Sequence, residues 1–243
     1  TILLPMKHVL ITGGAGFIGY HLAEYVRRTT TDHITIVDNL SRGQMDQDLQ
    51  ELLAHKDRLS FIQADLTDNS AYQTLPTNID QAYHLAATNG TRHFYEKPYQ
   101  ILRQDTLLNI QFLDWVTTLE KKPKLLYTST CETYAGALEA FNQLPLPTPE
   151  DVPRVISDIH NPRWSYAASK ILGEMLFIHF GNSQNIPTVI VDPHNFYGPR
   201  EGYDHVLPEL IERIQKQVDP FPIYGTENTR AFCYIDDAVE AMT

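Results

Sequence analysis

The sequence predicts an α/β fold in which helices cover both faces of a parallel sheet. Two observations predict it. Apolar runs of strand length alternate with segments of helical period, and a glycine-rich turn follows the first of these runs. Strict alternation of strand and helix implies right-handed crossovers between parallel strands. We therefore expect a doubly wound sheet over most of the chain and a small lobe at its C-terminal end.

Six apolar runs are rich in Val, Ile, Leu or aromatic residues, as strands buried on both faces are. The predicted strands are 9–11, 34–37, 59–62, 82–85, 125–127 and 189–191. The predicted helices are about 17–29, 47–55, 69–75, 99–120, 165–181 and 206–217. The alternation of strand and helix is regular up to about residue 135, and beyond it the sequence becomes richer in proline.

The second half of the chain contains two proline-rich stretches. Residues 141–163 hold five prolines and predict an irregular connection, not a linker, because apolar secondary structure resumes at once. Residues 193–229 are again rich in Pro, Gly and Tyr. These patterns predict a main domain at 1–192 and a partial lobe at 193–243 that is interleaved with the sheet.

Composition excludes several classes of function. The 30 acidic side chains outnumber the 19 Lys and Arg, and the resulting net charge of −11 makes nucleic acid an unexpected partner. Cys131 and Cys233 cannot form a disulfide framework, and no Cys or His spacing matches a metal site. No apolar run approaches the roughly 20 residues that span a bilayer. The N-terminus lacks the basic region and cleavage site of a signal peptide. We expect a cytoplasmic enzyme without a metal.

The glycine-rich turn predicts a dinucleotide site in a Rossmann-like fold. Glycines at 13, 16 and 19 allow a tight turn, close approach to a pyrophosphate, and close helix–strand packing. The helix N-terminus then offers N–H groups to phosphate. A carboxylate at the end of the second strand can bind an adenosine ribose and repels a 2′-phosphate, so NAD is favoured, with NADP kept open by Arg42. The expected NAD contacts are Gly13, Gly16, Phe17, Ile18, Gly19, Asp38 and Asn39.

Two later strand ends extend the predicted cofactor site. Asp65 and Leu66 follow the third strand, where a side chain and a backbone group could meet the adenine. Asp65 could equally cap the helix that follows it. Ala86 and Ala87 follow the fourth strand, where small residues let the phosphates and the nicotinamide ribose lie close to the backbone.

A tyrosine and a lysine four residues apart predict the chemistry. Tyr166 and Lys170 share one face of a helix, and an ammonium beside a phenol lowers the phenol's pKa from about 10. Such a tyrosine can take a proton from a substrate hydroxyl while hydride leaves the same carbon for NAD. The lysine can also hold the nicotinamide ribose. The pair alone is common on helix surfaces, but with the glycine turn it predicts a hydride-transfer site.

Three further segments complete a family pattern. They are Tyr127-Thr128-Ser129-Thr130-Cys131-Glu132-Thr133-Tyr134, Asn195-Phe196-Tyr197-Gly198-Pro199-Arg200, and Thr229-Arg230-Ala231-Phe232 with Ile235-Asp236-Asp237. From Lys7 to Ala241 the chain resembles an extended short-chain dehydrogenase/reductase of the NAD-dependent epimerase/dehydratase family, which acts on nucleotide-linked sugars. The resemblance implies a Thr130–Tyr166–Lys170 set, with Thr130 on the sugar 4-hydroxyl. It also implies substrate-diphosphate contacts from Asn195, Arg200 and Arg230, although Arg230 could instead form a surface ion pair.

The resemblance also ranks the activities. It implies oxidation of the sugar at C4, followed by a second step at C4, C5 or C6. Glu132 stands where 4,6-dehydratases and UDP-glucuronate decarboxylases have a catalytic or positioning glutamate, but Cys131 replaces the general-acid aspartate of the dehydratases. Residues 161–166 and Asp105 resemble the decarboxylases. Asp192 replaces an arginine often found there, which leaves the charge of the pocket open.

These features favour a decarboxylase or a 4-epimerase, with a dehydratase third. A non-catalytic NAD-binding sensor or scaffold is the rival from another class. The helices at 99–120 and 165–181 correspond to a four-helix dimer interface in the family, so the resemblance implies a homodimer. Family members continue beyond the position of Thr243, so we expect the substrate lobe to be incomplete in this chain.

Overall fold

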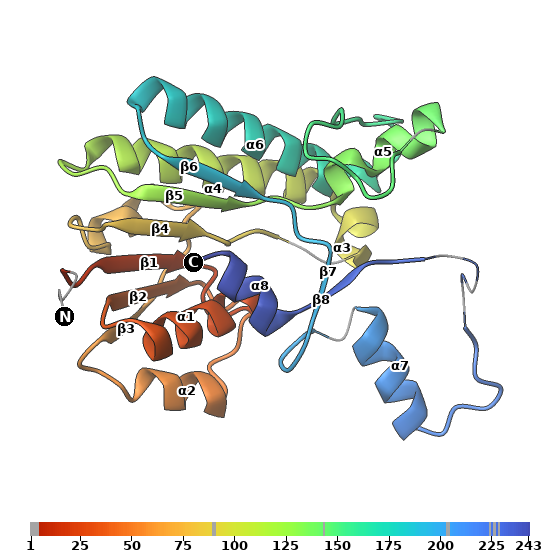
Figure 1. Cartoon of the computed structure of the whole chain (residues 1–243), viewed down its shortest axis with the longest axis horizontal. Helices are drawn as coiled ribbons and strands as arrows, with labels where there is room; N and C mark the ends of the chain where they lie inside the picture. The colour runs from red at the N-terminus through yellow and green to blue at the C-terminus, as the bar shows by residue number, and fades with distance from the viewer. Residues whose placement is uncertain are drawn as a thin grey trace.

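A six-stranded parallel sheet forms the centre of the molecule, as predicted (Figure 1). The computed structural model describes residues 5–88, 91–142, 144–202, 205–223, 225, 227 and 229–243. The strand order is β3-β2-β1-β4-β5-β6. The strands are β1 (His8–Thr12), β2 (His33–Asp38), β3 (Leu59–Gln63), β4 (Gln81–His84), β5 (Lys124–Thr128) and β6 (Thr188–Val191).

Helices cover both faces of this sheet because alternate side chains of each strand point to opposite faces. In β1, Val9 and Ile11 belong to a hydrophobic cluster on one face, and Leu10 belongs to the cluster on the other. The first cluster includes α1 (Phe17–Thr29), α2 (Gln47–Leu53) and α8 (Ile235–Ala241). The second includes α4 (Pro98–Thr118) and α6 (Trp164–Gln184). Figure 1 shows α1 beside α8, and α4 beside α6.

The structure adds three details to the predicted elements. The segment Asn69–Thr74 forms a 3-10 helix, η1. Two short helices that the sequence did not predict are α3 (Thr91–Glu96) and α5 (Glu132–Phe141). Asn142 ends α5 in the left-handed conformation, with φ 51°, which asparagine tolerates better than most residues. The described residues of 144–163 contain no helix or strand, so the predicted irregular connection is confirmed.

A small second sheet lies beyond the carboxyl edge of the main one. Its parallel strands are β7 (Asn195–Tyr197) and β8 (Phe232–Tyr234), and α7 (Val206–Gln215) lies between them in sequence. None of the residues of α7 is buried. At the right of Figure 1 these elements lie beyond the strand ends, whereas α8 returns to pack against α1. The lobe thus stands over the edge at which parallel sheets bind ligands.

Candidate functional site

The glycine turn places the start of α1 directly against the ends of β1 and β4. Gly13 has φ +71°, and a Cβ on it would lie 2.8 Å from the amide nitrogen of Ala86. A Cβ on Gly19 would lie 2.4 Å from the carbonyl oxygen of Gly13. These two glycines therefore serve close backbone packing, and Gly13 also supplies a conformation that side chains disfavour.

Gly16 has a different environment, which fits the diphosphate of NAD. A Cβ on Gly16 would meet only the carbonyl oxygen of Gly13 within 4 Å, at 3.2 Å. Gly16 is also the N-cap of α1, and no side chain caps the helix there. The N–H groups of the first turn of α1, which begins with Phe17 and Ile18, therefore have no side-chain cap. This is the arrangement that a bound pyrophosphate needs, so these residues fit the cofactor predicted from the sequence.

The Asp38 carboxylate lies at the end of β2 beside the glycine turn. One of its oxygens accepts a hydrogen bond from the amide of Ala15 at 3.0 Å, and the other accepts from the amide of Leu40 at 2.8 Å. Burial raises the pKa of Asp38, against the effect of these two hydrogen bonds. Each oxygen keeps a lone pair for a ribose hydroxyl. Asn39 is exposed, and its side chain accepts from the amide of Ser41 at 2.9 Å.

The two other strand ends differ in how well they suit a cofactor. Ala86 lies beside Gly13, and its amide donates to Thr12 Oγ1 at 3.3 Å; Ala87 follows it and is partly buried. The Asp65 carboxylate accepts from the amide of Thr67 at 2.9 Å and from its hydroxyl at 2.8 Å. Asp65 therefore stabilises a local turn, and the helix that follows is capped by Asp68, so the alternative that Asp65 caps this helix is wrong. Leu66 is buried in the core, and its carbonyl accepts from the Tyr72 hydroxyl at 3.0 Å.

Tyr166 and Lys170 lie buried near the start of α6. The Lys170 ammonium donates to the carbonyl oxygen of Thr128 at 2.7 Å and lies 5.7 Å from the centre of the Tyr166 ring. The Tyr166 ring stacks on Phe94 of α3, with ring centres 5.0 Å apart and planes inclined by 9°. Sequence reasoning missed Phe94, because no spacing rule connects a residue of α3 with a residue of α6.

The electrostatics of this pair differ from the sequence prediction. Burial raises the pKa of Tyr166 well above its usual range, and the nearby Asp105 acts in the same direction. Burial lowers the pKa of Lys170 to about 8, although Asp105 opposes this shift. The prediction that Lys170 lowers the pKa of Tyr166 is therefore wrong for this structure. The reason is that both side chains are desolvated and the ammonium is directed at a carbonyl oxygen.

Asp105 links α4 to both neighbouring parts of the site. It is 2% exposed, accepts from the amide of Thr88 at 2.7 Å, and accepts from the Ser169 hydroxyl at 3.2 Å. Thr88 follows β4, and Ser169 lies on α6 beside Lys170. From the sequence, Asp105 was noted only for its resemblance to the decarboxylases. A buried acid on the apolar face of a helix is the signal that could have indicated this role.

The predicted catalytic groups of β5 lie where β5 ends and α5 begins. The Thr130 hydroxyl accepts from the amide of Glu132 at 3.3 Å. The Glu132 carboxylate pairs with the Arg163 guanidinium at 3.2 Å, one turn before Tyr166 on the chain, and both side chains are about two-fifths exposed. Burial raises the pKa of the Cys131 thiol to about 11, and Glu132 adds to this rise. The structure thus brings Arg163, which the sequence did not assign, to the predicted glutamate.

The predicted substrate residues separate into two groups. The Asn195 amide donates to the carbonyl oxygen of Ala231 at 2.8 Å, so the pairing of β7 with β8 brings Asn195 next to the Arg230 segment. Arg230 is exposed and bonds the neighbouring Thr229 carbonyl at 2.9 Å. Arg200 is instead held between α1 and α2. Its guanidinium bonds both Asp46 carboxylate oxygens at 2.5 Å and lies 4.1 Å over the Tyr20 ring.

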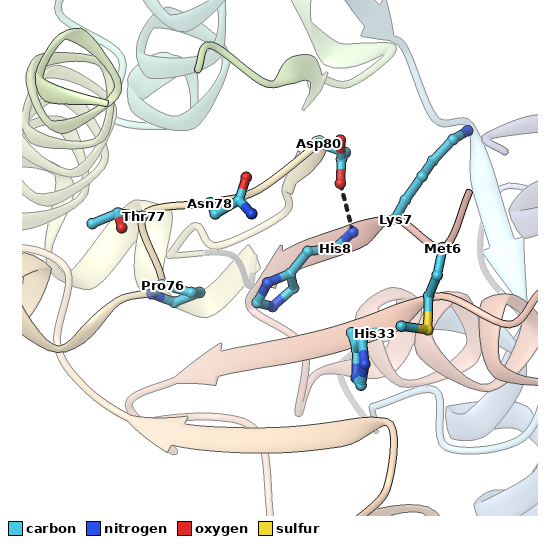
Figure 2. A pocket seen from close by; sticks show the side chains of 8 residues that line it. All are labelled: Met6, Lys7, His8, His33, Pro76, Thr77, Asn78 and Asp80. Atoms are coloured by element: carbon cyan, nitrogen blue, oxygen red, sulfur yellow. Dashed lines mark hydrogen bonds between the residues drawn. The ribbon is translucent and has the colours of Figure 1, made fainter. Parts of the chain in front are cut away.

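A hollow of about 430 Å³ lies at the opposite edge of the sheet (Figure 2). It is lined by Met6, Lys7, His8, His33, Pro76, Thr77, Asn78 and Asp80. The His8 ring bonds Thr35 Oγ1 at 2.8 Å, and Asp80 accepts from the amide of His8 at 2.8 Å. Ligands of open α/β sheets bind at the carboxyl ends of the strands, whereas this hollow lies at the amino ends. We therefore assign the function to the other edge.

Three sequence expectations can be compared with the described part of the chain. Its His, Cys, Asp and Glu side chains form no group that could hold a metal ion. Cys131 and Cys233 are both free thiols. No helix among the described residues is long and apolar enough to cross a membrane. The cytoplasmic location stays a prediction.

Comparisons with known proteins show which proteins the chain resembles. The chain is 35% identical over 239 residues to the UDP-N-acetyl-alpha-D-glucosaminuronate decarboxylase of Bacillus cytotoxicus, covering 97% of this chain and 70% of that protein. It is 28% identical over 249 residues to the dTDP-D-glucose 4,6-dehydratase of Dictyostelium discoideum, covering 98% of this chain and 55% of that protein. The chain therefore spans between about half and 70% of the lengths of these two relatives.

A solved structure shows the same architecture. It is the UDP-glucuronic acid 4-epimerase of Bacillus cereus in complex with UDP-glucuronic acid and NAD, with a TM-score of 0.79 and 27% identity. The match covers 97% of this chain and 71% of that one. The family model described as the NAD dependent epimerase/dehydratase family matches residues 9–243. With its glycine turn, Asp38 and Tyr166–Lys170 pair in place, the chain belongs to the NAD-dependent epimerase/dehydratase family.

Proposed function

We propose that the protein acts on a UDP-linked uronic acid, oxidises the sugar at C4 and removes its carboxyl group as carbon dioxide. The observation that carries this proposal is the grouping at one sheet edge of Tyr166 and Lys170 with the Glu132–Arg163 pair. The decarboxylase relative, 35% identical over 97% of this chain, supports the same activity. In this proposal residues 1–192 hold NAD and the catalytic groups, and 193–243 form part of the wall around the nucleotide sugar.

The chemistry follows from the position of the carbonyl group. Tyr166 would act as the phenolate and take the proton of the 4-hydroxyl, which Thr130 orients, while hydride leaves C4. Because burial raises the pKa of Tyr166, this step requires the positive charge of Lys170, together with that of NAD when it is bound, to favour the phenolate. Bound NAD supplies the hydride acceptor. The carboxyl group of a uronic acid is attached to C5, so a ketone at C4 makes it a β-keto acid, which loses carbon dioxide readily. The enolate left at C5 takes up a proton, and return of the hydride to C4 gives a product lighter by one carbon dioxide. The Arg163 guanidinium supplies the positive charge that a uronate carboxylate favours.

A 4-epimerase is the second candidate, and a dehydratase is disfavoured. The 4-epimerase that is 27% identical over 97% of this chain, with UDP-glucuronic acid and NAD bound, supports the first of these. Dehydration needs an acid that protonates a departing hydroxyl. The Cys131 thiol, with its pKa raised to about 11 by burial, is a poor proton donor at neutral pH.

Product analysis tests these three activities. The purified protein would be incubated separately with UDP-N-acetylglucosaminuronate, UDP-glucuronate and UDP-glucose, and the products followed by mass spectrometry and NMR. A product lighter by one carbon dioxide from a uronate is the expected result. An unchanged mass with inverted C4 would establish the epimerase, and loss of water would establish the dehydratase. No product with any sugar, despite bound NAD, would favour the sensor or scaffold.

We also propose that the protein forms a homodimer through α4 and α6, which pack side by side. Both helices expose large apolar side chains: Tyr99, Leu102, Ile110, Leu172, Met175 and Ile178. The α4 face also has a shallow hollow of about 420 Å³. Light scattering after size-exclusion chromatography should give a dimer, and the paired substitution Leu102→Glu with Met175→Glu should give a monomer. A monomeric wild-type protein at micromolar concentration would contradict the proposal.

A further inference from the structure

Four side chains from four segments meet behind the end of β5. Ser129 follows β5, Glu174 lies on α6, Asp192 follows β6, and Arg154 comes from the irregular segment 144–163. The Arg154 guanidinium donates to Glu174 at 3.1 Å and to Asp192 at 2.5 Å. The Ser129 hydroxyl donates to the other oxygen of Glu174. The Arg154 cation therefore joins the Glu174 and Asp192 carboxylates, and Glu174 also binds Ser129, which is next to Thr130 in the chain.

The cluster is largely withdrawn from solvent. Ser129 is 2% exposed and Glu174 is 6% exposed, while the side chains of Arg154 and Asp192 are 22% and 23% exposed. Burial raises the pKa of Asp192, and the nearby Glu174 carboxylate raises it further. Removing one partner of a buried ion pair leaves an uncompensated charge, which costs far more than losing a surface pair. Among the described residues of this cluster, Arg154 supplies the positive charge that compensates the Glu174 and Asp192 carboxylates.

The cluster is connected directly to the catalytic residues. Glu174 follows Tyr166 and Lys170 at intervals of four residues, so the three side chains share one face of α6. Ser129 immediately precedes Thr130. The hydrogen bond from Ser129 to Glu174 therefore fixes the segment that carries Thr130 against the helix that carries Tyr166 and Lys170.

Arg154 also attaches its own segment to the rest of the site. The guanidinium lies 5.4 Å over the Tyr134 ring of α5, and the amide of Val155 donates to the Thr133 carbonyl at 3.2 Å. A Cβ on Gly136 would lie 2.0 Å from the Val155 carbonyl oxygen, so the segment lies directly on α5. The same segment leads to Arg163 and the start of α6.

We propose that Arg154 is a positioning residue with two separable effects. Through Glu174 it holds Ser129, and with it Thr130, in place relative to Tyr166 and Lys170. Through its own backbone it fixes the irregular segment against α5. The first effect rests on the proposed function, because it concerns the alignment of the groups that act at C4. The second effect is a property of the fold and needs no turnover to be measured.

Moving the guanidinium to the other side of the cluster separates the two effects. The variants are Arg154→Leu, and Arg154→Leu combined with Asp192→Arg, which returns a cation beside Glu174 from the end of β6. Arg28→Leu, on an exposed arginine in the last turn of α1, is the matched control. The measurements are kcat and KM for the sugar that the wild-type protein converts, the NAD retained on purification, and the rate of protease cleavage within 144–163.

Arg154→Leu should lower kcat roughly ten- to a hundredfold, with KM changed by less than about threefold, since misalignment slows the reaction more than binding. Retained NAD should not change, because the glycine turn lies elsewhere. The double variant should recover most of the lost kcat. Protease cleavage within 144–163 should be faster than in the wild-type protein in both variants, because the segment no longer carries the cation that attaches it. The control should match the wild-type protein in every measurement.

Three results would overturn the proposal. They are an Arg154→Leu protein with wild-type kcat, a folded double variant with retained NAD and no recovery of kcat, and wild-type cleavage rates in both variants. If Arg154→Leu does not fold, the double variant decides. A soluble, active double variant supports the proposal, and an insoluble one rejects it. If the wild-type protein converts no nucleotide sugar, the proposed function fails, and the cleavage rates still test the attachment of the segment.

Discussion

The cofactor end and the chemistry end of the same sheet edge are built in different ways. At the cofactor end, the contacts come from β1, α1 and β2 together with the end of β4, and each involves the backbone, as at Gly13, Gly19 and Asp38. At the chemistry end, groups from α3, α4, the end of β5, α5, α6 and an irregular segment lie around Tyr166. The first end depends on local conformation, and the second depends on buried charges that come from distant parts of the chain.

This difference teaches which changes each end tolerates. A backbone-built site fails when a side chain is added, because there is no space for one. A charge-built site fails when a side chain is removed, because its partner is left buried and unpaired. Four experiments test this contrast, beginning with the one of largest expected effect.

Tyr166→Phe should lower kcat by about two to four orders of magnitude, which is the usual contribution of a positioned general base. The same variant should retain its NAD, because Tyr166 lies outside the glycine turn that holds the cofactor. Tyr25→Phe, on a tyrosine of α1 outside the site and outside the proposed dimer face, is the matched control and should behave as wild type. Loss of NAD from Tyr166→Phe would show that the two ends are not independent.

Gly19→Ala should lower the free energy of unfolding by about 1–3 kcal/mol, as overpacking commonly does, and should also abolish NAD retention. The reason is the 2.4 Å approach of the new Cβ to the Gly13 carbonyl oxygen. Gly16→Ala should keep nearly wild-type stability and lose only NAD affinity, since its Cβ would enter the space for the pyrophosphate. Urea unfolding and released NAD absorbance measure the two effects. Equal destabilisation by both variants would contradict the distinction.

Lys170→Met should change the pH dependence of stability. Burial lowers the pKa of Lys170 from 10.5 to about 8, so between these values the unfolded chain binds a proton that the folded chain has lost. Stability from this group therefore rises with pH across that window and is flat below it. Urea unfolding from pH 7 to pH 10 should show wild type gaining on Lys170→Met above pH 8. Lys216→Met, on an exposed lysine, should show no such gain.

Cys131→Ser should have the smallest effect. The buried thiol, with its raised pKa, donates no proton in the proposed reaction, so kcat should fall far less than the roughly hundredfold contribution of a general acid. Initial rates with the converted sugar measure this. A hundredfold loss of kcat would identify Cys131 as a general acid and would favour the dehydratase activity.

The same contrast explains which parts of the structure could be predicted from the sequence. The six strands of the main sheet were predicted because buried parallel strands are continuous apolar runs, whereas the short strands β7 and β8 were not predicted. The helix α1 was predicted with its observed bounds. The glycine turn and Asp38 were predicted because their geometry depends on spacing within one unit. The helices α3 and α5 were missed because they are short and lie in connections.

The chemistry end was predicted only as a set of residue types. The position of Tyr166 on α6 followed from a motif, but the direction of its pKa shift depended on burial and on Asp105, which no spacing reveals. Arg200 was predicted to bind substrate, yet it bonds Asp46, 154 residues away in the sequence. Long-range charge pairs of this kind follow from the folded arrangement, because the sequence alone does not indicate which of its 30 acidic residues Arg200 meets.

The Arg200–Asp46 contact has a consequence for protein engineering. Asp46 caps α2 and ends the loop that begins at Asp38, so the contact ties the region that selects the adenosine half of the cofactor to the lobe after β6. Exchanging this loop to change cofactor preference would also remove the acid that receives Arg200. A graft over 38–48 should therefore retain Asp46, or carry a compensating change at Arg200, if the lobe is to keep its place.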